Sequence, residues 1–165
     1  NAKLSLLMSI LDNFRTTLFR QTQFAEFELK IHEHVEAGKP LTSDILNSIY
    51  KDILYRYYGH EEGVCHIEDM YEIEWAYIPH FYYNFYVFQY ATSFSASVAL
   101  SQDILSKKDG AVDKYISFLS SGSSKYPIDL LKTTGVDMTS GTPIEKTIAA
   151  MNQYMDEVEK LLKMR

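Results

Sequence analysis

The chain has 165 residues, of which 46% are hydrophobic, and its 16 Lys and Arg against 22 Asp and Glu give a formal net charge of −6 at pH 7. With only 4 Pro and 7 Gly, this composition excludes disordered and collagen-like chains. The acidic balance argues against nucleic acid as a partner, because such binding needs a basic stripe, and the single Cys65 excludes an intramolecular disulfide. Ten of the 13 Tyr lie between Tyr50 and Tyr90, so the aromatic residues are concentrated in one part of the chain.

Apolar residues recur at helical spacing from the first residues onward. They predict one long helix, or two in near-continuity, from about Ala2 to Val35, with Gly38 and Pro40 ending it. The pattern already starts at Leu4, with neither an initial Met nor a capping residue before it. We therefore expect the chain to be a fragment of a longer polypeptide.

The second helix is expected to begin at a cap, either Thr42 or Ser43, and to run to about Tyr58, where a glycine follows as a typical stop. Residues 59–69 are predicted to form a polar connection. The short segment 71–77 is expected to be helical.

The remaining sequence predicts four more helices. Pro79 stands where a helix begins, because its fixed φ suits the first turn, and it predicts a helix from about Pro79 to Leu105. Thr142 and Glu145 have the spacing of a capping box at the start of the last helix. These last three helices are expected at about 111–119, 127–135 and 142–163. Because no alternation typical of strands and no internal repeat is visible, we expect an all-α class, with residues 1–165 as a single all-α fragment around a central Tyr-rich helix.

Residues 75–102 contain no Asp, Glu, Lys or Arg, and a stretch of this length could span a bilayer. The stretch nevertheless carries His80, Asn84 and Gln89, along with several Ser and Tyr. We therefore expect a helix that is packed on most sides inside a larger helical protein, and no membrane as a partner.

The five His do not form a known metal motif. A zincin helix needs His-Glu-x-x-His, which His32 and His34 do not provide because they are two positions apart. His60, Cys65 and His66 could form a loop metal site, but their spacing matches no common zinc pattern. The favoured interpretation of these three is that they are solvent-exposed loop residues.

The segment from His80 to Tyr90 sorts its aromatic residues by type if it is an α-helix. At about 100° per residue, His80, Tyr86 and Tyr90 fall within roughly 60° of Tyr83, and three Phe fall on the opposite face. Phe prefers full burial, whereas Tyr and His carry a hydrogen-bonding group at the end of an apolar body. The pattern predicts a helix that buries one face and directs hydrogen-bond donors from the other. The three Phe are Phe81, Phe85 and Phe88.

The ordinary alternative is that these Tyr pack in the core and that backbone groups satisfy their hydroxyls. Spacing alone favours this alternative, and the sorting is imperfect, since Tyr82 lies between the two faces and Phe94 falls on the Tyr side. The Tyr between residues 50 and 58 are expected to serve packing.

Three blocks of sequence occur in an order that is more specific than any one of them. They are FRQTQFAEFE at 19–28, IPHFYYNFYVFQYAT at 78–92, and YPIDLL followed by GVDM within 126–138. Together the blocks resemble the C-terminal part of the oligoendopeptidase F family, whose members are zinc metallopeptidases related to thimet oligopeptidase. The resemblance covers essentially the whole chain.

The resemblance implies a cytoplasmic enzyme whose helices enclose a channel for short peptide substrates. In that family, zinc is held by a His-Glu-x-x-His helix and a further Glu, all of which would lie upstream of Asn1. The cofactor is therefore expected to be zinc in the parent enzyme, with no metal ligand in this chain. The isolated chain should be inactive without the upstream part of the same polypeptide, and its exposed half-site would favour self-association.

The resemblance also implies roles for the Tyr-rich segment. Related peptidases use a His and Tyr residues on a C-terminal helix to stabilise the oxyanion and to contact the substrate backbone. His80 aligns with that His, and Tyr83, Tyr86 and Tyr90 are the candidates for the catalytic Tyr. His80, Tyr83 and Tyr90 are also the substrate-binding candidates, and which Tyr faces the oxyanion stays open.

Arg20, Glu26 and Glu28 lie on a helix rich in Phe. We expect them to form a half-buried ion-pair network between helices rather than to contact substrate.

The alternative function is a non-catalytic helical module whose Tyr-rich face binds a partner protein or peptide. It rests on the same Tyr-rich segment and on the missing zinc motif.

Overall fold

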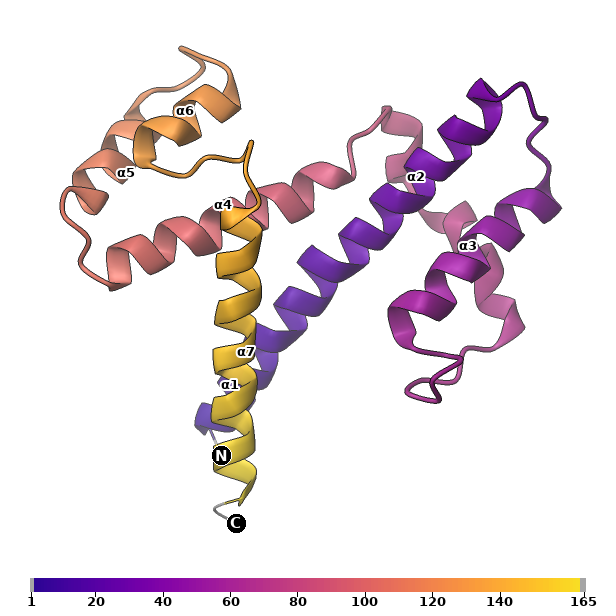
Figure 1. Ribbon diagram of the computed structural model, residues 1–165, viewed down its shortest axis with the longest axis horizontal. Helices are drawn as coiled ribbons and strands as arrows, with labels where there is room; N and C mark the ends of the chain where they lie inside the picture. The colour runs from indigo at the N-terminus through magenta and orange to yellow at the C-terminus, as the bar shows by residue number, and fades with distance from the viewer. Residues whose placement is uncertain (1, 164–165) are drawn as a thin grey trace. The chain divides into compact units, whose positions relative to one another are not determined.

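The computed structural model describes residues 2–163, which are mainly helical and contain no strand (Figure 1). The predicted all-α class is thereby confirmed. The chain divides into two compact units, one formed by Asn1–Leu18 with Thr92–Arg165 and the other by Phe19–Ala91. Each unit has its own buried core and its own ion pairs.

Three helical segments follow one another at the start of the chain: α1 (Ala2–Asn13), the π-helix η1 (Phe14–Phe19) and α2 (Arg20–Glu36). The prediction of helices in near-continuity is confirmed. Within the π-helix, the Thr16 hydroxyl donates to the carbonyl of Asp12 in α1 at 2.8 Å. Such side-chain bonds compete with the regular helical ladder and favour a local change of pitch.

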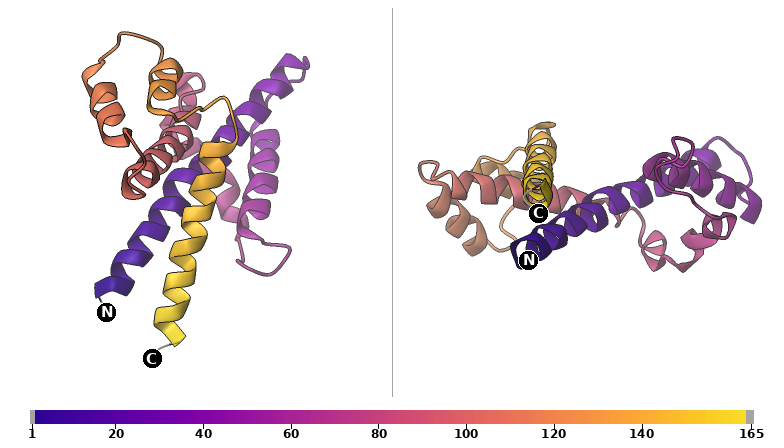
Figure 2. Two further views of the ribbon diagram at one scale, coloured as in Figure 1. Left: turned by 60° about the vertical axis from the view of Figure 1, so that its left-hand side comes forward. Right: turned by 90° about the horizontal axis from the view of Figure 1, so that it is seen from below.

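In the first unit, α1 packs along α7 (Thr142–Lys163), and the two helices lie side by side in Figure 1 and in the left panel of Figure 2. Phe14, which is 2% exposed, closes the contact: its ring meets Phe94 edge-on at 5.0 Å and Tyr154 at 6.0 Å between centroids. Burial of one such side chain contributes about 1.5–3 kcal/mol. Thr142 was expected to cap α7 in a capping box, but Gly141 takes the cap position, because its carbonyl accepts the first helical hydrogen bonds, from Ile144 and Glu145. Thr142 is the first residue of the helix.

The same unit contains the pair α5 (Ala111–Ser120) and α6 (Pro127–Thr134), which pack on one another and end close to the predicted bounds. Gly135 closes α6 with a φ of 93°, a value that favours glycine. Small side chains on α4 (Phe88–Leu105) allow close approach in the neighbouring core. The buried members of that core are Ala96, Ala99, Leu100 and Val136.

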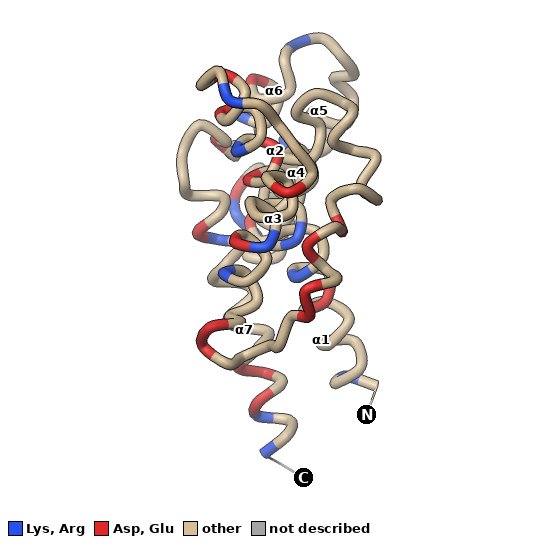
Figure 3. The backbone as a smooth tube through the Cα atoms, turned by 90° about the vertical axis from the view of Figure 1, so that its right-hand side faces the viewer, with Lys and Arg blue, Asp and Glu red and all other residues tan. Residues whose placement is uncertain are grey.

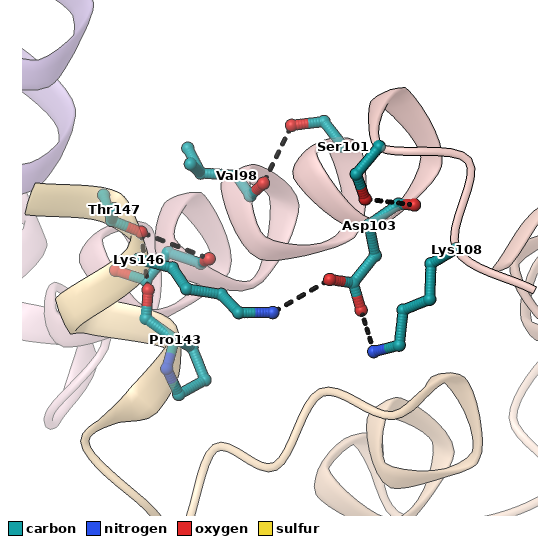
Figure 4. Close-up of polar contacts among 9 residues, drawn as sticks. Val98, Ser101, Asp103, Lys108, Pro143, Lys146 and Thr147 are labelled. Carbon is teal, nitrogen blue, oxygen red and sulfur yellow. Dashed lines mark hydrogen bonds and ion pairs between the residues drawn. The ribbon is translucent and has the colours of Figure 1, made fainter. Parts of the chain in front are cut away.

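Asp103 connects the end of α4 to α7. Its carboxylate accepts hydrogen bonds from the ammonium groups of Lys108 at 2.6 Å and Lys146 at 2.8 Å, as Figure 4 shows. Burial raises the pKa of Asp103, but the bonds and charges of the two Lys outweigh it and hold the pKa below its ordinary value. Beside this ion pair, the fully buried Thr147 donates to the Pro143 carbonyl at 2.7 Å, so the polar groups of this contact are satisfied.

The second unit is built by α2, α3 (Ser43–Tyr58) and two 3₁₀ segments, η2 (Asp69–Tyr77) and η3 (Pro79–Tyr83). Thr42 is the cap of α3, because its hydroxyl accepts the Ile45 N–H at 3.4 Å. The segment 71–77, which was expected to be helical, lies within the 3₁₀ helix η2. The buried core of this unit consists of Phe24, Phe27, Tyr50, Ile53, Leu54 and Val87.

The predicted α-helix from Pro79 to Leu105 is wrong in its first part. The 3₁₀ segment η3 comes first, Asn84 and Phe85 then have φ values of 49° and 59°, and α4 begins only at Phe88. Residues with left-handed φ values interrupt an α-helix. The helical angles worked out for the Tyr-rich segment therefore do not apply.

Among residues 2–163, no helix combines the length and the apolar character needed to cross a bilayer. Figure 3 marks the charged positions along the backbone, and residues of both signs occur along α7.

Asp103→Asn is expected to lower the free energy of unfolding at pH 7 by about 1–3 kcal/mol, because the amide loses two charge-assisted hydrogen bonds. The folded pKa of Asp103 lies below the unfolded value of about 3.9, so the stabilisation is present above that pH and is lost as the pH falls through the folded pKa. Urea titrations should show the full difference at pH 7 and a progressively smaller one as the pH falls below about 3.9. The exposed Asp109→Asn is the control, and an Asp103→Asn effect independent of pH would contradict the assignment.

Candidate functional site

The Tyr-rich segment turns sharply between η3 and α4. Pro79 starts η3, the 3₁₀ turn ends at Tyr83, and the left-handed residues Asn84 and Phe85 then redirect the chain. Asn adopts this conformation readily, whereas for a bulky residue such as Phe it costs roughly 1–3 kcal/mol. The surrounding structure must therefore hold the turn in place.

The turn brings together the four residues predicted to form the site. The ring of His80 lies 6.4 Å from that of Tyr83, 5.9 Å from that of Tyr86 and 5.7 Å from that of Tyr90, measured between centroids. Tyr86 also meets Tyr83 at 5.9 Å and Tyr90 at 5.6 Å, both edge-on. We call these four residues the His–Tyr cluster. They come together by a turn rather than along one face of an α-helix.

Hydrogen bonds and exposure differ among the members of the His–Tyr cluster. The Tyr90 hydroxyl lies 3.4 Å from Nε2 of the half-buried His80, within hydrogen-bond distance. A hydrogen bond with the Tyr86 hydroxyl, followed by loss of hydration, raises the pKa of Tyr90, so this group stays protonated at neutral pH. Tyr83 and Tyr86 are 63% and 39% exposed, which leaves both available for contact with another molecule.

The three Phe of this segment do not share one buried face. Phe81 packs in the core, with its ring 5.9 Å from Phe24 and 5.2 Å from Phe27. Phe85 and Phe88 are instead 38% and 47% exposed and line a pocket of about 350 Å³ beside α2. The predicted burial is wrong for Phe85 and Phe88, because the turn rotates them away from the core, whereas Phe81 is partly buried against the core.

Glu28 holds the turn from the side of α2. This carboxylate is 1% exposed, and its Oε1 accepts the backbone N–H of Phe85 at 2.8 Å. The ring of Phe85 lies over His32, with 4.4 Å between centroids. Sequence reasoning placed Glu28 in an ion-pair network and missed this role. The one available signal was Asn84, a residue type enriched at left-handed positions.

The expected ion pairs of this region are present for the other two residues. Arg20 pairs with Glu74 of η2, and Glu26 pairs with Arg56 of α3 at 2.6 Å. The predicted network between helices is thus confirmed for Arg20 and Glu26 and corrected for Glu28.

In the core of the second unit, Tyr50 makes two further polar contacts. It is fully buried, its hydroxyl donates to Glu74 at 2.5 Å, and it accepts from the Gln23 amide at 3.3 Å. Burial, reinforced by the hydrogen bond to the Glu74 carboxylate, raises the pKa of Tyr50 far above its ordinary value. This Tyr therefore serves packing and hydrogen bonding, as expected for the Tyr between residues 50 and 58.

The loop His residues have structural partners. The ring of His60 stacks on Tyr55 at 3.8 Å, lies 5.2 Å from that of His66, and accepts the Ile67 N–H through Nδ1 at 2.9 Å. Over residues 2–163, no group of three or more His, Cys, Asp or Glu side chains is placed to hold a metal ion. The described residues therefore do not fit a metal centre of their own.

Comparison with known proteins decides the family. The family model described as Peptidase family M3 matches residues 1–150. This chain belongs to peptidase family M3.

Relatives of the M3 chain confirm the resemblance to oligoendopeptidase F. Oligopeptidase PepF of Bacillus subtilis (strain 168) is 50% identical over 160 residues, which cover 97% of this chain and 23% of that protein. The plasmid oligoendopeptidase F of Lactococcus lactis subsp. cremoris is 45% identical over 161 residues and is covered to 26%. The crystal structure of oligoendopeptidase-F from Enterococcus faecium superposes with a TM-score of 0.92 at 42% identity, covering 99% of this chain and 31% of that one. The M3 chain thus spans about a quarter of the length of these curated relatives.

The M3 chain also has a cavity of about 650 Å³ in its first unit, between α4, α5 and α6. Its lining is apolar and hydroxyl-bearing, as at Leu100, Phe118 and Ser97, and Lys125 is its charged residue. This lining contains no His and no carboxylate, whereas the His–Tyr cluster combines an imidazole with three Tyr hydroxyls. The cluster is therefore the candidate site.

Tyr50→Phe in the M3 chain is expected to lower the free energy of unfolding by about 1–3 kcal/mol, because Glu74 and Gln23 each lose a buried partner. Urea titration measures the effect. Tyr71→Phe, at a position that is 51% exposed, should change the stability by less than about 0.5 kcal/mol. Equal stability of Tyr50→Phe and the unsubstituted protein would show that the hydroxyl contributes nothing.

Proposed function

We propose that this chain is part of a metal-dependent oligopeptidase that hydrolyses short peptides, and that the His–Tyr cluster binds the substrate and stabilises the oxyanion. The observation that carries the proposal is the convergence of one His and three Tyr, with ring centroids within 6.4 Å of His80. Family membership and the similarity to oligopeptidases support the reaction class.

The chemistry needed at such a site follows from peptide hydrolysis. Attack on the peptide carbonyl develops negative charge on its oxygen, and preorganised donors directed at that oxygen accelerate the step by about 10²–10³ each. The exposed hydroxyls of Tyr83 and Tyr86 can reach a bound peptide, and the His80 imidazole can donate beside them. Tyr90 is hydrogen-bonded to His80 and orients the imidazole, so the four residues act together.

In this proposal the metal is zinc, held by residues outside this chain, and the enzyme works in the cytoplasm on short peptides. The resemblance to oligoendopeptidase F supports the choice of zinc, compartment and substrate. The His–Tyr cluster then supplies the hydrogen-bond donors of the site.

His80→Ala or Tyr83→Phe, made in the oligopeptidase that contains this chain, is expected to lower kcat/KM for a short peptide by about 10²-fold, since each removes a donor to the developing charge. Tyr82→Phe is the matched control: the neighbouring ring is 83% exposed and lies outside the cluster, so its kcat/KM should stay within about twofold. If neither His80→Ala nor Tyr83→Phe costs more than about threefold, the oxyanion role is refuted.

Removal of metal by a chelator is expected to abolish hydrolysis by the same oligopeptidase, and added zinc should restore it. Because the described residues offer no group that could hold a metal ion, the fold of residues 80–90 should not depend on the metal, and their amide exchange should stay unchanged on chelation. Hydrolysis that persists in the chelator would contradict metal dependence. Faster exchange across 80–90 would contradict a cluster whose fold is independent of the metal.

A further inference from the structure

We propose that Glu28 is a positioning residue for the His–Tyr cluster: it holds the left-handed turn at Asn84 and Phe85 and thereby sets the geometry of His80, Tyr83 and Tyr86. The inference rests on the proposed function, because a positioning residue has an effect on rate only if the cluster acts in the reaction.

The turn lies between the residues that must meet. His80 and Tyr83 belong to the 3₁₀ segment before it, whereas Tyr86 follows it. If Asn84 and Phe85 relaxed to right-handed values, the chain would continue as a helix and the ring of Tyr86 would leave its stacked position 5.9 Å from His80. The cluster therefore depends on two backbone conformations that are unfavourable for side-chain-bearing residues.

Two contacts to α2 stabilise these conformations. The buried Glu28 carboxylate accepts the Phe85 N–H at 2.8 Å, which satisfies the donor at the most strained residue of the turn. The ring of His32, one helical turn further along α2, lies 4.4 Å from the ring of Phe85. Glu28 and His32 are four residues apart, so one face of α2 supports both the backbone and the side chain of Phe85.

A carboxylate at this position needs a reason other than an ion pair. Arg20 and Glu26, on the same helix as Glu28, have oppositely charged partners in η2 and α3, whereas Glu28 accepts a hydrogen bond from a backbone amide. Burying a carboxylate is unfavourable unless it is strongly hydrogen-bonded. The hydrogen bond from the Phe85 N–H gives the buried Glu28 such a partner, and Glu28 in turn gives this N–H a strong acceptor.

The test uses the whole oligopeptidase that contains this chain and a short reporter peptide. Glu28→Ala is expected to lower kcat by at least about tenfold with KM within about threefold, because the donors are displaced while the rest of the substrate contacts persist. Glu28→Gln keeps a carbonyl acceptor of the same length and should recover kcat to within about threefold. Ile53→Ala, a core truncation on α3 of the same unit, should lower the thermal midpoint comparably but leave kcat within about twofold.

A double-mutant cycle with His80→Ala separates this inference from the proposed function. If Glu28 acts through the cluster, the loss in the Glu28→Ala, His80→Ala double variant should be clearly smaller than the product of the two single losses. A large loss in His80→Ala together with a Glu28→Ala variant that behaves like Ile53→Ala would overturn the inference and leave the proposed function intact. No loss in His80→Ala would overturn the proposed function itself.

Should Glu28→Ala fail to fold, His32→Ala tests the same turn from a half-buried position on α2. Loss of the ring contact with Phe85 is expected to lower kcat by about threefold, again with little change in KM. An unchanged kcat in His32→Ala, with Glu28→Leu, which removes the acceptor but keeps much of the volume, also at full rate in that background, would show that the turn needs neither contact, and the inference would fail.

Discussion

The backbone of Asn84 and Phe85 is the constraint on which the His–Tyr cluster depends. Both residues have left-handed φ values, and Phe is a residue type for which that conformation is unfavourable. A buried carboxylate of α2 bonds the amide of Phe85, and a His ring lies against its side chain. Because the turn is held by α2, the position of the donors is set by a helix that is more than fifty residues away in the sequence.

The second unit supports that helix by polar contacts as well as by apolar packing. Arg20 and Glu26 join α2 to η2 and α3, and the buried Tyr50 hydroxyl connects Glu74 with Gln23. Each of these groups has a partner, so the desolvation of the buried charges is offset. The result is a rigid support for exposed Tyr hydroxyls, which suits a site that must present donors in a fixed geometry.

The helical spacing in the sequence grouped four residues whose rings do lie together, although the backbone that joins them is not an α-helix. His80 and Tyr83 are three apart, which places them on one side of a 3₁₀ turn as well. Tyr86 and Tyr90 are four apart, the spacing that brings side chains together at the start of a helix. Each pair obeys a local spacing rule, and the turn joins the pairs. The same helical spacing predicted burial for Phe85 and Phe88, which are exposed, because the direction of their side chains depends on the turn.

The sequence by itself determined the all-α class, most helix bounds, the paired roles of Arg20 and Glu26, and the family blocks that point to an oligopeptidase. These features depend on local periodicity, capping residues and residue order, all of which can be read directly from the sequence. The tertiary structure alone decided the 3₁₀ character of Pro79–Tyr83, the left-handed turn and the partner of Glu28. The physical reason is that an unfavourable φ is populated only when distant groups stabilise it, and no local pattern records a hydrogen bond between residues 28 and 85.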